Sequence, residues 1–199
     1  ALDPKPGEMV LDMCAAPGGK TTHIAEMMRN TGTVIANDLD LKRIKALGGN
    51  LCRLGVLNTF ICQYNGVNLP EKILFDRVLV DAPCSAEGNA RRSPHLRSGA
   101  SLVYIRRISN FQKNALLKAI DLTKVGGVIV YSTCTFAPEE NEMVVQYALE
   151  NRDVKLEPIE LDIPHCPGLT EWDGRRFHPD MELCFRIYPH LLNLSLIHI

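Results

Sequence analysis

Two cysteine-containing turns are the places where this chain has residues suited to covalent chemistry. The segments DAPCS at 81–85 and STCT at 132–135 each follow a hydrophobic run that is typical of a buried strand. A glycine-rich turn, DMCAAPGGKT at 12–21, follows a similar run near the beginning of the chain. Few reactions need two thiols beside such a turn. One is methyl transfer to a pyrimidine ring, in which a thiolate attacks the ring and a second group helps to release the product.

The elements that must position these motifs follow from the hydrophobic pattern. Short apolar runs predict strands, and apolar residues spaced by three or four predict helices. The predicted strands are 9–14, 33–38, 59–64, 76–80, 128–131 and 154–159, and the predicted helices are 18–30, 40–54, one within 101–124 and one beginning at Pro138. This alternation predicts an α/β fold with a mostly parallel, twisted sheet and helices on both faces. Ligands of such sheets bind outside the carboxyl ends of the strands, where all three motifs lie.

The composition limits the class of protein. A length of 199 residues with 46% hydrophobic and 23% charged residues is typical of one globular domain. No apolar run approaches the roughly 20 residues of a membrane span, and no signal peptide is visible, so we expect a cytoplasmic protein that does not contact a membrane. None of the seven cysteines forms a CxxC pair, which argues against a zinc site and against a disulfide framework.

The charge is unevenly distributed although the net charge is only −1. Residues 88–120 contain no Asp or Glu but seven basic residues, namely Arg91, Arg92, Arg97, Arg106, Arg107, Lys113 and Lys118. This stretch is either a solvated helix face or a footprint for a phosphate backbone.

The glycine-rich turn resembles neither a P-loop nor GxGxxG, and by itself it is compatible with a plain connection between strand and helix. Asp38, at the end of the second predicted strand, suits a carboxylate that binds the ribose hydroxyls of an adenosine cofactor. Alternatively, Asp38 caps the helix that follows. Lys20 is either a solvated helix residue or a charge directed into the site.

Taken together, the motifs resemble the Sun/Fmu (RsmB-like, NOL/NOP/Sun) family of RNA cytosine-5 methyltransferases, which use S-adenosylmethionine. The matching segments are LDPKPGEMVLDMCAAPGGKTTHIA, VIANDLDLKRIKALGGNLCRLGV, FDRVLVDAPCS, GGVIVYSTCTFAPEENE and RRFHPD…RIYPH. The resemblance implies a Rossmann-like class I methyltransferase domain over residues 1–190, without the family's N-terminal RNA-binding extension. Residues 191–199 do not match the family's last antiparallel strand, which we therefore expect to be missing or replaced.

The resemblance also assigns residues to roles. Cys134 corresponds to the nucleophile that attacks carbon 6 of cytosine, Cys84 to the cysteine that helps to release the product, and Asp81 to the carboxylate that contacts the flipped base; Lys20 completes the expected catalytic group. The expected cofactor-binding residues are Cys14, Ala15, Ala16, Pro17, Gly18, Gly19, Lys20, Asp38, Arg43, Asn65 and Asp81. Asn65 stands where the family usually has Asp. The expected RNA-binding residues are Arg91, Arg92, Arg175, Arg176 and His178, and Tyr188 and His190 either stack near the base or pack in the core.

The leading hypothesis is thus a methyltransferase core that acts on rRNA or tRNA as a monomer without a metal. Two alternatives remain open. In a DNA cytosine-5 enzyme the nucleophile is the cysteine of a PC dipeptide, which here is Cys84. A non-catalytic module would bind cofactor and RNA without transferring a methyl group.

Overall fold

The computed structural model describes residues 1–90 and 99–192 and divides into two compact units. The first, the sheet unit, consists of residues 2–82 and 115–132. The second, the thiol unit, contains residues 83–114 and the chain from Thr133 onward, together with Ala1. The helix α3 (Leu102–Asp121) supplies residues to both.

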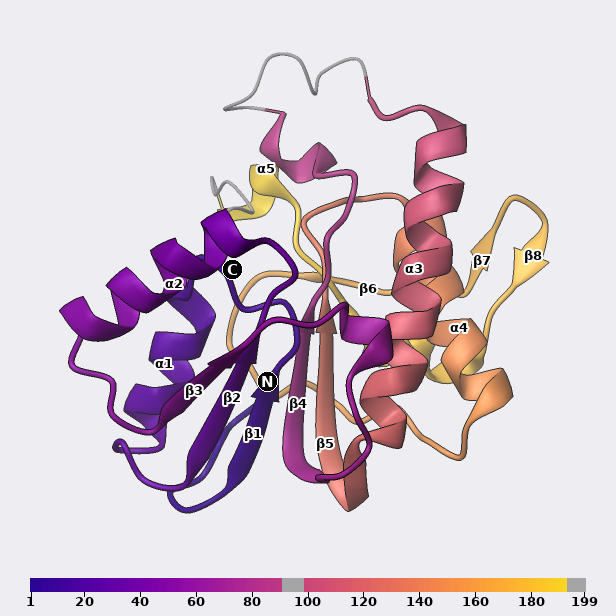
Figure 1. Cartoon of the computed structure of the whole chain (residues 1–199). Coiled ribbons are helices and arrows are strands. Elements are labelled where there is room, and N and C mark those ends of the chain that lie inside the picture. Colours follow the sequence, from indigo (N-terminus) through magenta and orange to yellow (C-terminus); the bar gives the residue numbers. More distant parts are fainter. Residues whose placement is uncertain (91–98, 193–199) are drawn as a thin grey trace. The chain divides into compact units, whose positions relative to one another are not determined.

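The sheet unit contains five strands in the order β3-β2-β1-β4-β5, all of them parallel (Figure 1). Their bounds are β1 Met9–Asp12, β2 Thr33–Asn37, β3 Thr59–Cys62, β4 Phe75–Asp81 and β5 Thr123–Ser132. The first five predicted strands are thus confirmed, with β5 beginning earlier than predicted. Within the described residues this sheet has no antiparallel member.

Two helices of the sheet unit pack on the same face of the sheet. They are α1 (Gly19–Met27) and α2 (Leu41–Arg53). Ile24 of α1 packs with Val10 and Val34, while Leu47 of α2 packs with Ala36. Val34 and Ala36 are two positions apart on β2, so their side chains point to the same face. On the opposite face Leu11, Val78 and Val80 are buried too, so both faces of the central strands are covered.

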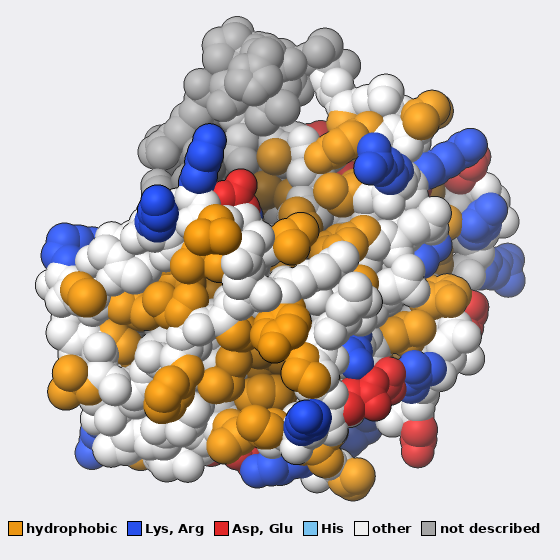
Figure 2. Space-filling model, viewed as in Figure 1, with side chains coloured by type: hydrophobic (Ala, Val, Ile, Leu, Met, Phe, Trp, Pro, Cys, Tyr) orange, Lys and Arg blue, Asp and Glu red, His pale blue; other side chains and the backbone are white. Residues whose placement is uncertain are grey.

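The β3 edge of the sheet unit carries exposed hydrophobic side chains. Leu57 has a relative exposure of 84% and Phe60 of 66%, and Ile61 and Tyr64 are exposed as well. Figure 2 shows hydrophobic side chains gathered over this part of the sheet unit. The edge strand is four residues long, and short edge strands offer little backbone for pairing with another chain.

The thiol unit is built from short elements around one longer helix. These are η2 (Glu87–Asn89), the first part of α3, η4 (Pro138–Glu140), α4 (Glu142–Asn151), β6 (Cys166–Pro167), β7 (Glu171–Trp172), β8 (Arg175–Arg176), η5 (Pro179–Leu183), β9 (Phe185–Arg186) and α5 (Pro189–Leu192). The helix predicted to begin at Pro138 therefore begins as the single turn η4, and α4 follows from Glu142.

The prediction of a strand at residues 154–159 is wrong. These residues belong to no strand, although Val154, Leu156 and Ile159 are half-buried and alternate with exposed residues. Alternating burial is therefore achieved here without backbone pairing, and Pro158 has no N–H to give to a sheet. The predicted boundary at residue 190 falls inside α5, and residues 193–199 of the predicted atypical tail lie outside the described residues.

Candidate active site

The glycine-rich turn of the sheet unit connects β1 to α1, as predicted. Gly18 has a φ of 106° and forms the N-terminal cap of α1, and a Cβ atom at this position would lie 2.8 Å from Leu47 Cδ1. Both the positive φ and the close approach of α2 require glycine here. The turn thus brings a tightly packed stretch of backbone to the carboxyl end of β1.

Asp38, at the end of β2, is bonded to this turn. Its exposure is 4%; Oδ2 accepts a hydrogen bond from the Ala16 N–H at 3.1 Å and lies 3.3 Å from Arg43 Nη1. The Arg43 guanidinium also donates to the Ala16 carbonyl. The alternative role for Asp38, as the cap of α2, is wrong, because Asp40 Oδ1 accepts from the N–H groups of Lys42 and Arg43.

Lys20 and Asp81 form an ion pair at the ends of α1 and β4. Lys20 Nζ lies 2.8 Å from Asp81 Oδ2, and Ser132 Oγ donates to Asp81 Oδ1 at 2.8 Å. About one third of each charged side chain is exposed, so both groups remain accessible to a ligand. Lys20 is therefore directed toward the carboxyl edge of the sheet rather than into solvent.

Asp12 is a further carboxyl group at this edge, and its role was not predicted from the sequence. It is buried; Thr21 Oγ1 donates to its Oδ2 at 2.7 Å, and its Oδ1 has no hydrogen-bond partner among the described residues. Burial raises the pKa of Asp12 to about 7, helped by the nearby Asp81 carboxylate and opposed by the Thr21 hydrogen bond. The available signal was its position, since Asp12 ends an apolar strand just as Asp38 and Asp81 do.

Two further cofactor candidates, Cys14 and Asn65, lie in the same unit. Burial, with Asp12, Asp38 and Asp81 nearby, raises the pKa of the Cys14 thiol to about 12, so Cys14 is a neutral thiol. Asn65 caps the short turn η1 (Gly66–Asn68) after β3, and its side chain accepts from the Val67 N–H at 3.4 Å.

The two predicted thiols meet in the thiol unit. Cys84 Sγ and Cys134 Sγ are 3.1 Å apart, although 50 residues separate them along the chain. The Cys134 N–H donates to Cys84 Sγ at 3.3 Å. The hydrogen bond with Cys134, with burial next in importance, raises the pKa of Cys84 strongly. Cys84 therefore favours its protonated form, and its sulfur lies in contact with that of Cys134.

Polar side chains join the two cysteine segments to each other. Ser85 Oγ lies 2.7 Å from Thr135 Oγ1, and Glu87 Oε2 accepts from Thr135 Oγ1 at 2.9 Å and from the Phe136 N–H at 3.3 Å. The fully buried Glu140 accepts from the Ser85 N–H at 3.0 Å through Oε2. Glu87 is thus an acceptor that holds the segment after Cys134.

The predicted RNA-binding residues are only partly described. Arg91 and Arg92 lie outside the described residues. Arg175 and Arg176 are exposed on β8, where Arg176 stands opposite Glu171 in the hairpin. His178 is partly exposed and its Nδ1 accepts from the Asp180 N–H.

The two aromatic candidates form a short stack with Phe136. The ring centroids of Phe136 and Tyr188 are 5.5 Å apart, and those of Tyr188 and His190 are 5.7 Å apart. Arg186 donates to the Tyr188 hydroxyl, so the middle ring of the stack is held by a hydrogen bond.

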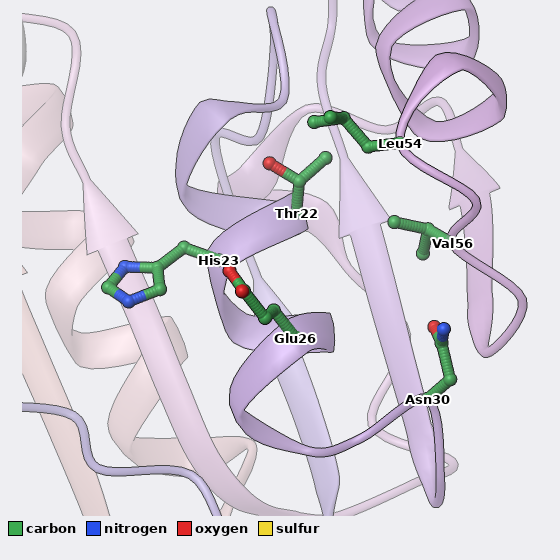
Figure 3. Close-up of a pocket in the computed structure, with 6 residues that line it drawn as sticks. All are labelled: Thr22, His23, Glu26, Asn30, Leu54 and Val56. Atoms are coloured by element: carbon green, nitrogen blue, oxygen red, sulfur yellow. The ribbon is translucent and has the colours of Figure 1, made fainter.

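One cavity of the sheet unit holds none of these residues. It measures about 300 Å³ and is lined by Thr22, His23, Glu26, Asn30, Leu54 and Val56. Figure 3 shows that the His23 ring points away from the side chains of Thr22, Leu54, Val56 and Asn30. We assign it no ligand.

Comparison with known proteins identifies the family to which the chain belongs. The family model described as 16S rRNA methyltransferase RsmB/F matches residues 1–193. The chain belongs to this family. It is 47% identical over 200 residues to a 28S rRNA (cytosine-C(5))-methyltransferase of Mus musculus, covering 98% of this chain and 25% of that protein. It is 42% identical to a tRNA (cytosine(49)-C(5))-methyltransferase of Pyrococcus abyssi, covering 94% and 61%.

A solved family structure shares the fold. The crystal structure of NSun6 from Pyrococcus horikoshii with SFG, an analogue of S-adenosylmethionine, superimposes with a TM-score of 0.78 at 38% identity, covering 92% of this chain and 47% of that one. The predicted Rossmann-like fold is therefore confirmed. The chain spans about a quarter of the mouse relative and less than two thirds of the archaeal one.

The raised pKa of Asp12 predicts a pH-dependent effect on stability. The folded pKa of about 7 lies above the ordinary value of 3.8, so ionisation of Asp12 destabilises the fold as pH rises from about 4 through 7. Asp12→Asn removes this cost. At pH 8 the variant should be more stable than the wild type, by at most about 4 kcal/mol; at pH 4 this gain should vanish. Chemical denaturation at both pH values measures the difference, with the exposed Asp162→Asn as control. A difference that does not change with pH would contradict the assignment.

The contacts of Glu87 predict that its acceptor atoms, rather than its charge, stabilise the thiol unit. Glu87→Ala should lower the free energy of unfolding by about 2 kcal/mol, because Thr135 and the Phe136 N–H lose their acceptor. Glu87→Gln keeps an acceptor oxygen and should cost less than half as much. Equal losses in both variants, measured by denaturant unfolding, would show that the charge matters instead.

Proposed function

We propose that this chain is the catalytic core of an RNA (cytosine-5)-methyltransferase. It transfers a methyl group from S-adenosylmethionine to carbon 5 of a cytosine in rRNA or tRNA, through a covalent bond between Cys134 and the base. The observation that carries the proposal is the contact between two thiols, of which Cys84 retains its proton. The names of the mouse and archaeal relatives support both classes of RNA.

The cofactor is proposed from the sheet unit. Three observations fit an adenosine cofactor: the open space beside Gly19 in the turn, the buried Asp38 carboxylate after β2, and the Asp12 Oδ1 at the end of β1, which has no hydrogen-bond partner among the described residues. When bound, S-adenosylmethionine supplies an electrophilic methyl group. Asp38 would hold the ribose hydroxyls, Lys20 and Asp81 would contribute charge at the same edge, and Asn65 would contact the adenine side.

The thiol unit provides the covalent step. Carbon 5 of cytosine is a weak nucleophile until a thiolate adds to carbon 6, which makes carbon 5 electron-rich. Cys134 would be this thiolate, because the proton shared by the two sulfurs stays on Cys84. Asp81 would bind the pyrimidine edge as electron density moves into the ring. The base must be unstacked to react, at a cost of a few kcal/mol.

Release of the product reverses the attack. After methylation carbon 5 loses its proton to a base, the bond between Cys134 Sγ and carbon 6 breaks, and the electron pair returns to sulfur. Cys84 Sγ lies 3.1 Å from Cys134 Sγ and would stabilise the departing thiolate by donating its S–H. The raised pKa of Cys84 disfavours the DNA-enzyme alternative, in which Cys84 would itself be the nucleophile. The cytoplasmic location and the monomeric state stay predictions from the sequence.

The roles of the cysteines predict that Cys84→Ala traps the enzyme on its substrate, because attack survives while release fails. The variant is incubated with S-adenosylmethionine and total cellular RNA, and a denaturant-resistant adduct should appear on a gel. The adduct should be absent from Cys84→Ala/Cys134→Ala, and the exposed Cys52→Ala serves as control. Sequencing of the trapped RNA distinguishes rRNA from tRNA.

Other outcomes of this experiment are equally informative. An adduct formed by Cys134→Ala instead would make Cys84 the nucleophile and support the DNA-type chemistry. Binding of cofactor and RNA with neither an adduct nor methyl incorporation would support the non-catalytic module.

The role of Asp38 predicts a loss of cofactor affinity on substitution. Asp38→Asn should weaken the binding of S-adenosylmethionine by at least about tenfold, because a hydrogen bond to a charged acceptor is lost. Asp38→Ala should weaken it further, since the Ala16 N–H also loses its acceptor. Asp40→Asn, which keeps a good helix cap, is the matched control. Unchanged affinity by calorimetry would refute the ribose role.

A further inference from the structure

Asn89 is a polar side chain beside the proposed nucleophile that neither the sequence motifs nor the family comparison singled out. It is the last residue of the turn η2 (Glu87–Asn89), five positions after Cys84. Its Nδ2 lies 3.6 Å from Cys134 Sγ, within hydrogen-bond distance for a sulfur acceptor. The amide therefore directs an N–H group at the sulfur.

The turn that carries Asn89 is held against the Cys134 segment by backbone bonds. The Gly88 N–H donates to the Cys134 carbonyl at 3.0 Å, and the N–H of Asn89 donates to the Ala86 carbonyl at 2.9 Å. Glu87, in the same turn, accepts from the Phe136 N–H. These contacts of Glu87, Gly88 and the Asn89 backbone fix the position of Asn89 relative to Cys134, so this position does not depend on the Asn89 side chain.

The other end of the Asn89 amide indicates that the residue is not there for stability. Its Oδ1 is buried without a hydrogen-bond partner among the described residues, which is a net cost to folding. An apolar side chain of the same volume would avoid this cost. An asparagine at this buried position therefore points to a function for its Nδ2 atom, which does have a partner.

We propose that Asn89 is a positioning residue for the nucleophile, whose amide N–H stabilises the thiolate of Cys134 and fixes the direction of its sulfur. The inference rests on the proposed function in assigning the attack to Cys134. The Asn89 amide donates to Cys134 Sγ, which also lies 3.1 Å from Cys84 Sγ. Donors to the charged form of a thiol favour that form.

The test is the pH dependence of alkylation of Cys134, which needs neither RNA nor cofactor. Iodoacetamide reacts with the thiolate, and Cys84 and Cys134 fall in different tryptic peptides because Arg91 and Lys124 separate them, so mass spectrometry follows each thiol separately. In Asn89→Leu the alkylation midpoint of Cys134 should rise by about one pH unit, a roughly tenfold loss of thiolate at pH 7. In Asn89→Asp it should rise further, because a carboxylate would face the sulfur.

The controls separate positioning from folding. Asn89→Leu should unfold at the same denaturant concentration as the wild type or a higher one, since the buried unsatisfied oxygen is removed. The exposed Cys52 should keep its profile in every variant, and Asn110→Ala, an exposed asparagine of the same unit, should leave Cys134 unchanged.

An unchanged Cys134 profile in both Asn89→Leu and Asn89→Asp would overturn the proposal, and so would a loss of stability in Asn89→Leu without a shift of the profile. If Cys134 shifts as expected but no RNA adduct forms in the Cys84→Ala experiment, the role of Asn89 stands and the proposed function fails. The two proposals therefore fail separately.

Discussion

The thiol pair depends on Glu140, a carboxylate without exposed surface that lies six residues after Cys134 and bonds to the segment of Cys84. Its Oε2 accepts from the Ser85 N–H at 3.0 Å and from Gln112 Nε2 at 2.9 Å, and Gln112 also donates to the Pro83 carbonyl. A buried carboxyl group is costly unless donors satisfy its oxygens, and removal of one donor leaves an oxygen without that partner. The network therefore specifies one arrangement of the two segments, and the distance between the sulfurs of Cys84 and Cys134 is a consequence of that arrangement.

In the sheet unit, three carboxyl groups must be accommodated at one edge of the sheet. Parallel strands place their carboxyl ends at one edge, so Asp12, Asp38 and Asp81 all lie there. Asp38 and Asp81 have cationic partners in Arg43 and Lys20. Asp12 is completely buried, and burial raises its pKa to about 7 although Thr21 donates a hydrogen bond to it. A buried carboxyl oxygen without a hydrogen-bond partner lowers the stability of the fold, and packing does not require it. We therefore connect Asp12, which lies where ligands of such sheets bind, with the proposed cofactor.

Local patterns were sufficient to predict the sheet, the turn at 12–21 and the two cysteine motifs, because strand and helix periodicity and short motifs are properties of neighbouring residues. Contacts between distant segments were not predictable in this way. Nothing in the sequence indicates that Lys20 pairs with Asp81, or that Asn89 lies beside Cys134, since these partners meet only through the fold. The strand predicted at 154–159 failed for the same reason, because alternation shows half-burial and not which backbone is available for pairing.

The two cysteines are chemically alike, and their different proposed roles follow from their surroundings. Two thiols 3.1 Å apart do not ionise independently, because a negative charge on one raises the pKa of the other. The hydrogen bond with Cys134, and after it burial, raises the pKa of Cys84, so in the proposed reaction the remaining proton would stay on Cys84. A positioned amide donor at Cys134 biases the pair in the same direction. The second thiol then has a purpose that a carboxylate or an amine would not serve as well: it carries a proton to the nucleophilic sulfur without placing a full charge beside the base.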